Sequence, residues 1–194
     1  MLRPVLALAL LGACGAPPDD ARADTPVEDA AAADLAPPRP ATVDRSTFVE
    51  GQPQTEVLRL ARVDAFPTPF SVYLRPGVTY TPPVDGEPVR FVAGTPPAHG
   101  EVTVRAAPGQ SPAALAAAAR AEHPSAFPLD DYAWADESLG YTDGAHGGIV
   151  HIARHDGAVF VVETHAPLEG GDGFAPTVQT ILDTWRWADG SALR

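Results

Sequence analysis

The sequence Ile149-Val-His-Ile-Ala-Arg-His155, Asp156-Gly157, Ala158-Val-Phe-Val-Val-Glu-Thr-His165 decides the predicted fold. Two runs of strand-forming residues flank Asp-Gly, a pair preferred in two-residue type I′ turns. The turn sets the register of the hairpin, in which His151 lies opposite Val162. Apolar side chains then occupy both faces, so we expect a strand pair that is covered on both sides.

One helix is predicted before this hairpin in the chain, and a second helix after it. Ser111 and Pro112 are typical of a helix start, an alanine-rich run follows to Glu122, and Pro124 ends it. A second helix is expected over residues 174–187. Its apolar residues recur at helical spacing, at Phe174, Val178, Ile181, Leu182 and Trp185.

Short strands separated by proline and glycine turns are expected before the first helix. They cover residues 55–62, 70–75, 78–81, 88–93 and 101–106. No strand is predicted over residues 132–148, which hold more glycine and acidic residues than a strand favours. The order of elements predicts an α+β fold, an antiparallel sheet with helices packed on it.

This order resembles the PsbP-like superfamily over residues 66–187. The resemblance rests on Phe70-Ser-Val-Tyr-Leu-Arg-Pro76 and Ala158-Val-Phe-Val-Val-Glu-Thr164. Ile181-Leu-Asp-Thr-Trp-Arg-Trp187 is similar to the final helix of the bacterial DcrB-like lipoprotein branch. The resemblance implies an α-β-α sandwich and a non-catalytic role as an accessory or binding protein, with no shared catalytic residues.

Composition excludes several classes of protein. The 194 residues are 45% apolar, with 22 prolines and 17 glycines, which excludes a collagen, a coiled coil and a multi-span membrane protein. All 13 basic residues are arginine, and the 25 acidic residues bring the formal net charge to -12. This charge repels nucleic acid, so no nucleic-acid partner is expected.

The N-terminus has the features of a secretory signal peptide. Arg3 precedes seven apolar residues at 5–11, far fewer than the roughly 20 that cross a bilayer as a helix. Leu11-Gly12-Ala13-Cys14 resembles the lipobox of bacterial lipoproteins. The resemblance implies diacylglycerol on the Cys14 thiol, cleavage after Ala13, and acylation of the new N-terminus with palmitate-type chains.

The chain is therefore expected to have three parts. Residues 1–13 are the signal peptide, residues 14–53 a disordered tether rich in Pro, Ala and Asp, and residues 54–194 one globular domain. The lipid on Cys14 would hold the domain to a membrane of the cell envelope. In a cell with two membranes this would be the outer membrane, with the domain facing the periplasm or the cell surface.

No metal site or cofactor is predicted. On one strand, His151 and His155 lie about 13 Å apart, too far to share an ion. His146, in the loop before the hairpin, could approach His151 or Asp143, so His146 and His151 stay as weak candidates for a mononuclear site.

The remaining candidate site is an aromatic groove for an apolar or carbohydrate ligand, formed by Tyr132, Trp134 and Tyr141. The alternative is that Trp134 belongs to the core. The sequence contains no G-x-S-x-G, S-x-x-K or phosphate-binding glycine motif, so no enzyme is predicted.

The expected function is a lipid-anchored envelope module that binds a protein or small ligand without catalysis. Two alternatives stay open. One is an envelope hydrolase that uses carboxylates or a His-bound metal, and the other is a structural envelope component.

Overall fold

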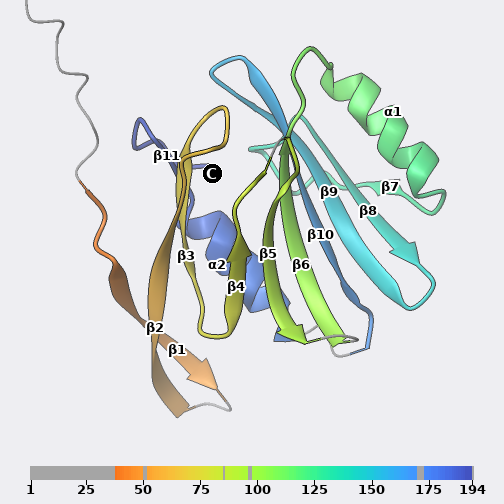
Figure 1. Cartoon of the computed structure of the whole chain (residues 1–194). Coiled ribbons are helices and arrows are strands. Elements are labelled where there is room, and N and C mark those ends of the chain that lie inside the picture. Colours follow the sequence, from red (N-terminus) through yellow and green to blue (C-terminus); the bar gives the residue numbers. More distant parts are fainter. Residues whose placement is uncertain (1–37, 50–51, 85, 96–97, 170–172, 194) are drawn as a thin grey trace, which may run out of the picture. The chain divides into compact units, whose positions relative to one another are not determined.

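The chain forms two antiparallel β-sheets and two helices in the residues that the structure, a computed structural model, describes: 38–49, 52–84, 86–95, 98–169 and 173–193 (Figure 1). The four-stranded sheet has the order β1-β2-β3-β11 and contains β1 (Thr42–Val49), β2 (Gln52–Val63), β3 (Phe70–Leu74) and β11 (Arg186–Trp187). The seven-stranded sheet has the order β4-β5-β6-β10-β9-β8-β7. Its strands are β4 (Val78–Thr81), β5 (Val89–Thr95), β6 (Ala98–Ala106), β10 (Ala158–Pro167), β9 (His146–His155), β8 (Glu137–Asp143) and β7 (Phe127–Pro128).

The central hairpin β9–β10 has the predicted turn and the predicted register. Asp156 and Gly157 have φ of 48° and 77°, the left-handed pair that a type I′ turn requires. His155 pairs with Ala158, and His151 pairs with Val162. Of the predicted earlier strands, residues 78–81 match β4, and β3, β5 and β6 lie within two or three residues of the expected bounds.

Both faces of the hairpin are buried, as predicted. The inner face shares one core with the four-stranded sheet and helix α2 (Ala175–Thr184), in which Phe160, Val72 and Ile181 are at most 3% exposed. The outer face packs Ile152 and Val161 against Leu115 of helix α1 (Pro112–Glu122). Figure 1 shows α1 beside β8 and β9, and α2 on the other side of the seven-stranded sheet.

Helix α1 begins as predicted, because the Ser111 side chain accepts a hydrogen bond from the Ala114 N–H at 3.2 Å. Helix α2 is shorter than predicted and ends at Thr184. Trp185 is extended, with ψ of 131°, and its ring stacks on Phe70 at 3.8 Å between centroids. The next residues form β11, in which Trp187 pairs with Phe70. Pairing with β3 and stacking in the core thus outweigh the helical pattern at this end.

The prediction of an α+β fold, with helices packed on an antiparallel sheet as an α-β-α sandwich, is wrong. The inner face of the seven-stranded sheet is covered mainly by a second sheet, and α2 lies within the core that the two sheets share. This second sheet was not predicted from the sequence, because β1 lies in the predicted tether and β11 in the predicted helix.

Strand β8 lies in the glycine- and acid-rich segment where no strand was predicted. Its Gly140 is buried, and a Cβ there would come within 2.7 Å of the Phe127 ring. The glycine is therefore a packing requirement of the β7–β8 pair and does not indicate a turn.

Residues 42–49, placed by sequence in the disordered tether, pair along their whole length with β2. The ordered domain therefore begins before residue 54. Residues 14–37 of the predicted tether, like the signal peptide, lie outside the described residues. Within the described ranges, neither helix has the length and apolar character needed to cross a membrane.

Candidate functional site: an arginine-lined pocket

The register of the four-stranded sheet places two arginines on either side of a serine. Ser71 of β3 pairs with Arg62 of β2 on one side and with Arg186 of β11 on the other. Residues at one cross-strand position share a face of the sheet. The next position pairs Phe70 with Val63 and Trp187, all at most 4% exposed, so these point into the core. Arg62, Ser71 and Arg186 therefore project from the opposite, outer face.

A third arginine reaches the same position from the segment before β1. The Arg39 guanidinium donates from Nη1 to the Ser71 backbone oxygen at 3.0 Å and to Ser71 Oγ at 2.9 Å. Its Cζ also lies 4.4 Å from the centre of the Tyr73 ring, within cation–π distance. Tyr73 is held in turn, because its hydroxyl donates to the Pro40 carbonyl oxygen at 2.9 Å.

These residues line a pocket of about 590 Å³ that is open to solvent. Its floor is formed at β3 and β11, and its apolar walls include Pro38, Pro69 and Ala188. This volume lies within the range of small-molecule sites, about 300–1,000 Å³. The same pocket contains one carboxylate, that of the exposed Asp64.

The pocket brings the positive charges of three arginines close together. Burial lowers the pKa of Arg39 below its ordinary value, and repulsion from Arg186 and Arg62 acts in the same direction, while Tyr73 opposes the shift. Among the described residues, none of these three arginines has a carboxylate oxygen within 4.0 Å. Arg186 instead donates from Nη1 to the Trp185 carbonyl oxygen at 2.6 Å. The pocket thus holds three guanidinium groups that no carboxylate of the described residues contacts within 4.0 Å.

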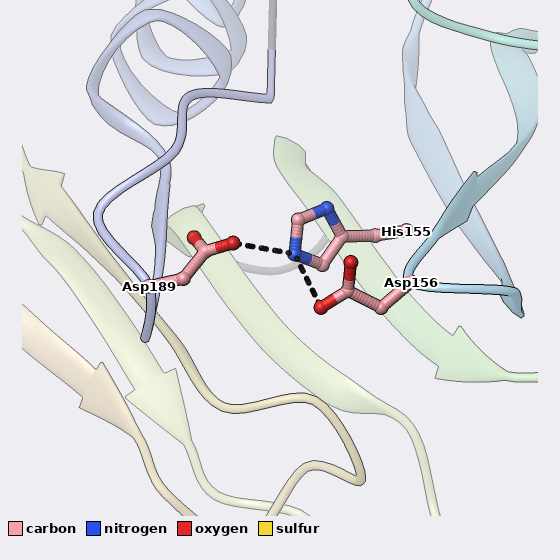
Figure 2. Close-up of side chains that lie close together, drawn as sticks. All are labelled: His155, Asp156 and Asp189. Carbon is pink, nitrogen blue, oxygen red and sulfur yellow. Dashed lines mark ion pairs between the residues drawn. The ribbon is translucent and has the colours of Figure 1, made fainter. Parts of the chain in front are cut away.

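A second cluster lies where the β9–β10 turn meets the loop after β11. Figure 2 shows His155 between Asp156 and Asp189, with Nε2 at 3.7 Å and 3.6 Å from the nearer oxygen of each carboxylate. The His155 ring stacks on Trp187 at 4.2 Å, and hydrogen bonds from Ser191 lower the pKa of Asp189. These three are the group of described residues whose ligand atoms, all within 4.8 Å of one another, could hold a metal ion.

A third group of polar residues lies on the outer face of the seven-stranded sheet. Buried Tyr141 donates to Glu163 Oε1 at 2.9 Å, and its hydroxyl also lies 3.1 Å from His165 Nδ1. His123, which caps the end of α1, stacks on the Tyr141 ring at 3.7 Å and lies 3.6 Å from Glu163. Burial, followed by the negative charge of Glu163, raises the pKa of Tyr141. These contacts join α1 to the sheet.

The two weak metal candidates do not meet. His146 stacks on His165, with 4.9 Å between ring centroids. Buried His151 lies five residues further along β9, so it faces the other side of the sheet, roughly 17 Å away. The His151 Nδ1 atom lies 2.9 Å from Ser138 Oγ. Each histidine therefore belongs to a different face.

The predicted aromatic groove is likewise divided between the two faces. Tyr132 and Trp134 both pack on His151, at 4.4 and 4.8 Å between ring centroids, and Trp134 also lies against the inner core. Tyr141 belongs to the outer cluster with α1. Trp134 is partly buried and packs against the core, which is close to the alternative interpretation.

The lipidation residue Cys14 and the cleavage residue Ala13 lie outside the described residues. The arginine pocket was not predicted, because Arg62 and Arg186 are more than 100 residues apart and meet only on either side of β3, and Arg39 joins them from outside the strands. One signal was present in the sequence, namely the exclusive use of arginine in a strongly acidic chain.

No known protein family, curated protein or solved structure matches the chain.

Proposed function

We propose that the protein is a lipid-anchored, non-catalytic binding module of the cell envelope that holds a small ligand in the arginine-lined pocket. The observation that carries the binding role is this pocket, which is lined by Ser71 and three arginines. The lipobox-like sequence that ends at Cys14 supports the anchor. Two or more acyl chains give stable attachment to a membrane, whereas one gives only reversible binding.

The position of the pocket fits this role. Pro38 and Arg39, which line it, follow directly on the segment that would join the domain to the lipid. A ligand bound there would lie near the membrane-proximal end of the ordered domain. The domain would then present its ligand to the envelope while the anchor prevents its diffusion away.

Lipidation is tested by growing cells with a fatty-acid probe and comparing the native chain with Cys14→Ser. The native protein should carry the label, move to the membrane fraction and lose residues 1–13, as read by mass spectrometry. The variant should lose the label. An unmodified Cys14 thiol in the exported native protein would contradict the anchor.

Binding is tested by incubating the purified protein with a small-molecule extract of the envelope and identifying retained molecules by mass spectrometry. The variant Ala188→Trp places a bulky side chain in the pocket and should lose the retained molecule. The matched control Ala117→Trp adds the same side chain to the exposed face of α1 and should retain it. Equal retention by both variants would contradict binding in this pocket.

One observation favours a second candidate, a metal-dependent hydrolase of the envelope. A nitrogen and two carboxylates at His155, Asp156 and Asp189 suit a divalent transition metal such as Zn²⁺. The 3.6 and 3.7 Å separations are close to those of two ligands bound about 2.1 Å from one ion. Under this alternative, Zn²⁺ binding is lost in His155→Ala and kept in His99→Ala. Without Zn²⁺ binding by the native protein, the candidate fails.

A further inference from the structure

We infer that the ligand of the arginine-lined pocket carries an oxyanion, a phosphate or carboxylate group, on a small organic body, and that Arg62, Arg186 and Arg39 hold this group above Ser71. The inference rests on the proposed binding role of the same pocket and adds the chemical class of its ligand.

The first argument is that the pocket brings together three arginines that have no acidic partner among the described residues. The chain has 25 acidic and 13 basic residues, so carboxylates greatly outnumber arginines. Four other described arginines, Arg75, Arg90, Arg120 and Arg154, each pair with a carboxylate within 4.0 Å. The three pocket arginines have no carboxylate of a described residue within 4.0 Å. Arg45, Arg59 and Arg105 have none either, but they do not line this pocket, where three such arginines come together. Positive charges held together without acidic partners are suited to an external anion.

The second argument is the geometry that strand pairing imposes. Arg62 and Arg186 flank Ser71 on neighbouring strands, so their Cα atoms lie roughly 10 Å apart, twice the spacing between strands. Two long side chains at this separation can converge on one group placed between them. A planar guanidinium offers paired N–H donors that match the two oxygens of a carboxylate or phosphate.

The third argument is the state of the Ser71 hydroxyl. Its oxygen accepts a hydrogen bond from Arg39 Nη1 at 2.9 Å, which leaves its proton free to donate and one lone pair still able to accept. The arginines can only donate. Each of the four side chains can therefore offer a donor at this position, and three of them cannot accept, so a group that accepts hydrogen bonds is the matching partner.

The fourth argument is size. The pocket volume of about 590 Å³ is far larger than an inorganic anion needs, since one water molecule occupies about 30 Å³ in the liquid. Pro38, Pro69 and Ala188 provide apolar walls beside the arginines. A ligand that fills the site therefore combines a charged group with an organic body.

The test measures binding of phenyl phosphate and of its neutral counterpart phenol to the full chain by calorimetry. We expect phenyl phosphate to bind more tightly than phenol. Arg62→Gln and Arg186→Gln should each weaken phenyl phosphate binding about tenfold or more, because each removes a charged hydrogen-bond donor. Arg105→Gln on β6, which changes the net charge by the same amount outside the pocket, should have little effect. Thermal unfolding of each variant without ligand confirms that it folds.

A second arm separates two sources of the same chemistry, a soluble phosphate ester and a phospholipid headgroup. Cys14→Ser protein, which lacks the acylation site, is mixed with phosphatidylglycerol or phosphatidylcholine vesicles. Binding of phenyl phosphate supports a soluble ligand. Binding only to phosphatidylglycerol vesicles, lost in Arg62→Gln, supports a headgroup, and both results keep the inference.

The inference fails if phenol binds as well as phenyl phosphate. It also fails if Arg62→Gln and Arg186→Gln weaken neither phenyl phosphate binding nor vesicle binding. In that case, a ligand that is retained from the envelope extract and lost in Ala188→Trp keeps the proposed binding role while excluding an oxyanion. If no ligand depends on the pocket, the proposed role fails as well.

Discussion

Ser71 lies beside three arginines that come from different segments of the chain, and its hydroxyl oxygen accepts a hydrogen bond from one of them. Arg62 and Arg186 reach it through strand pairing, and Arg39 reaches it through two hydrogen bonds. The one carboxylate of the pocket, Asp64, is exposed and adds a negative charge beside the arginines. Asp64 should therefore weaken the binding of an anionic ligand.

Asp64→Asn should raise the affinity for phenyl phosphate about two- to fivefold, because it removes a like charge whose screened repulsion is worth roughly 0.5–1 kcal/mol. Calorimetry at 0.1 M salt measures the change. The control Asp130→Asn removes an exposed charge outside the pocket lining and should leave the affinity unchanged. Weaker binding in Asp64→Asn would contradict the repulsion.

The raised pKa of Tyr141 predicts that the protein loses stability at alkaline pH. Its pKa is raised in the folded protein, mainly by burial, so the folded state keeps the proton when the unfolded chain releases it near pH 10. The stabilisation is complete below this pH and falls above it by up to about 1.4 kcal/mol per pH unit. Tyr80, whose pKa burial also raises, contributes in the same direction.

Urea unfolding between pH 8 and pH 11 measures this dependence. Tyr141→Phe should show a shallower fall above pH 10 than the native protein, whatever its stability at pH 8. Tyr132→Phe, on the other face of the sheet, should keep the native slope. Equal slopes in all three proteins would mean that Tyr141 ionises as readily in the folded state as in the unfolded chain.

The hairpin β9–β10 and the strand β8 beside it depend on a close approach of backbone and side chain at Gly148. A Cβ there would lie 1.8 Å from the Thr164 carbonyl oxygen and 2.7 Å from the Tyr141 hydroxyl. Gly148 pairs with both Tyr141 and His165, so Tyr141 can reach Glu163 and His165 only across a residue without a side chain. The glycine thus permits the hydrogen bonds that join three strands.

Gly148→Ala should lower the free energy of unfolding by at least about 2 kcal/mol, since the added methyl group forces strands apart. Gly173→Ala is the matched control, because a Cβ there meets nothing within 4 Å. Denaturant unfolding of both variants checks the difference. A Gly148→Ala protein as stable as the control would contradict the packing described for this strand pair.

A substitution at the first turn of helix α1 should have a smaller effect on stability. Ser111→Ala removes the cap on the Ala114 N–H and should cost about 1 kcal/mol. Ser111→Asp, which keeps a side-chain acceptor at this position, should retain native stability. A change in thermal unfolding equal in both variants would show that the cap contributes nothing.

The whole protein combines a strongly negative net charge with a local positive pocket. At physiological salt the screening length is about 8 Å, so a small anion in the pocket responds mainly to the nearest arginines. A long polyanion also experiences the net negative charge of the chain as a whole. The protein should therefore select small anions over polymeric ones.

This selection predicts that the Cys14→Ser protein does not bind duplex DNA at 0.15 M salt, in a gel-shift or fluorescence titration. The same sample should bind phenyl phosphate. Tight DNA binding that Arg62→Gln weakens would show that the pocket serves a polyanion, contrary to the net charge of -12.

Local patterns predicted much of the fold, because each depends on a few neighbouring residues. Asp156-Gly157 determined the turn and, through it, the pairing of every residue of the hairpin. Ser111 and Pro112 determined where α1 begins. Strand β8 could not be predicted in this way, since its Gly140 reflects a close contact with Phe127 that only the assembled sheet supplies.

The amino-acid order alone predicted the hairpin, the start of α1, the burial of both hairpin faces and the acidic charge, because periodicity, capping and composition are local or additive properties. Tertiary structure alone decided that a second sheet replaces the expected helical layer. It also decided that residues 186–187 form a strand and that Arg39, Arg62 and Arg186 meet at Ser71. The reason is that pairing between strands distant in sequence depends on which partner edge is available, and no single segment contains that information.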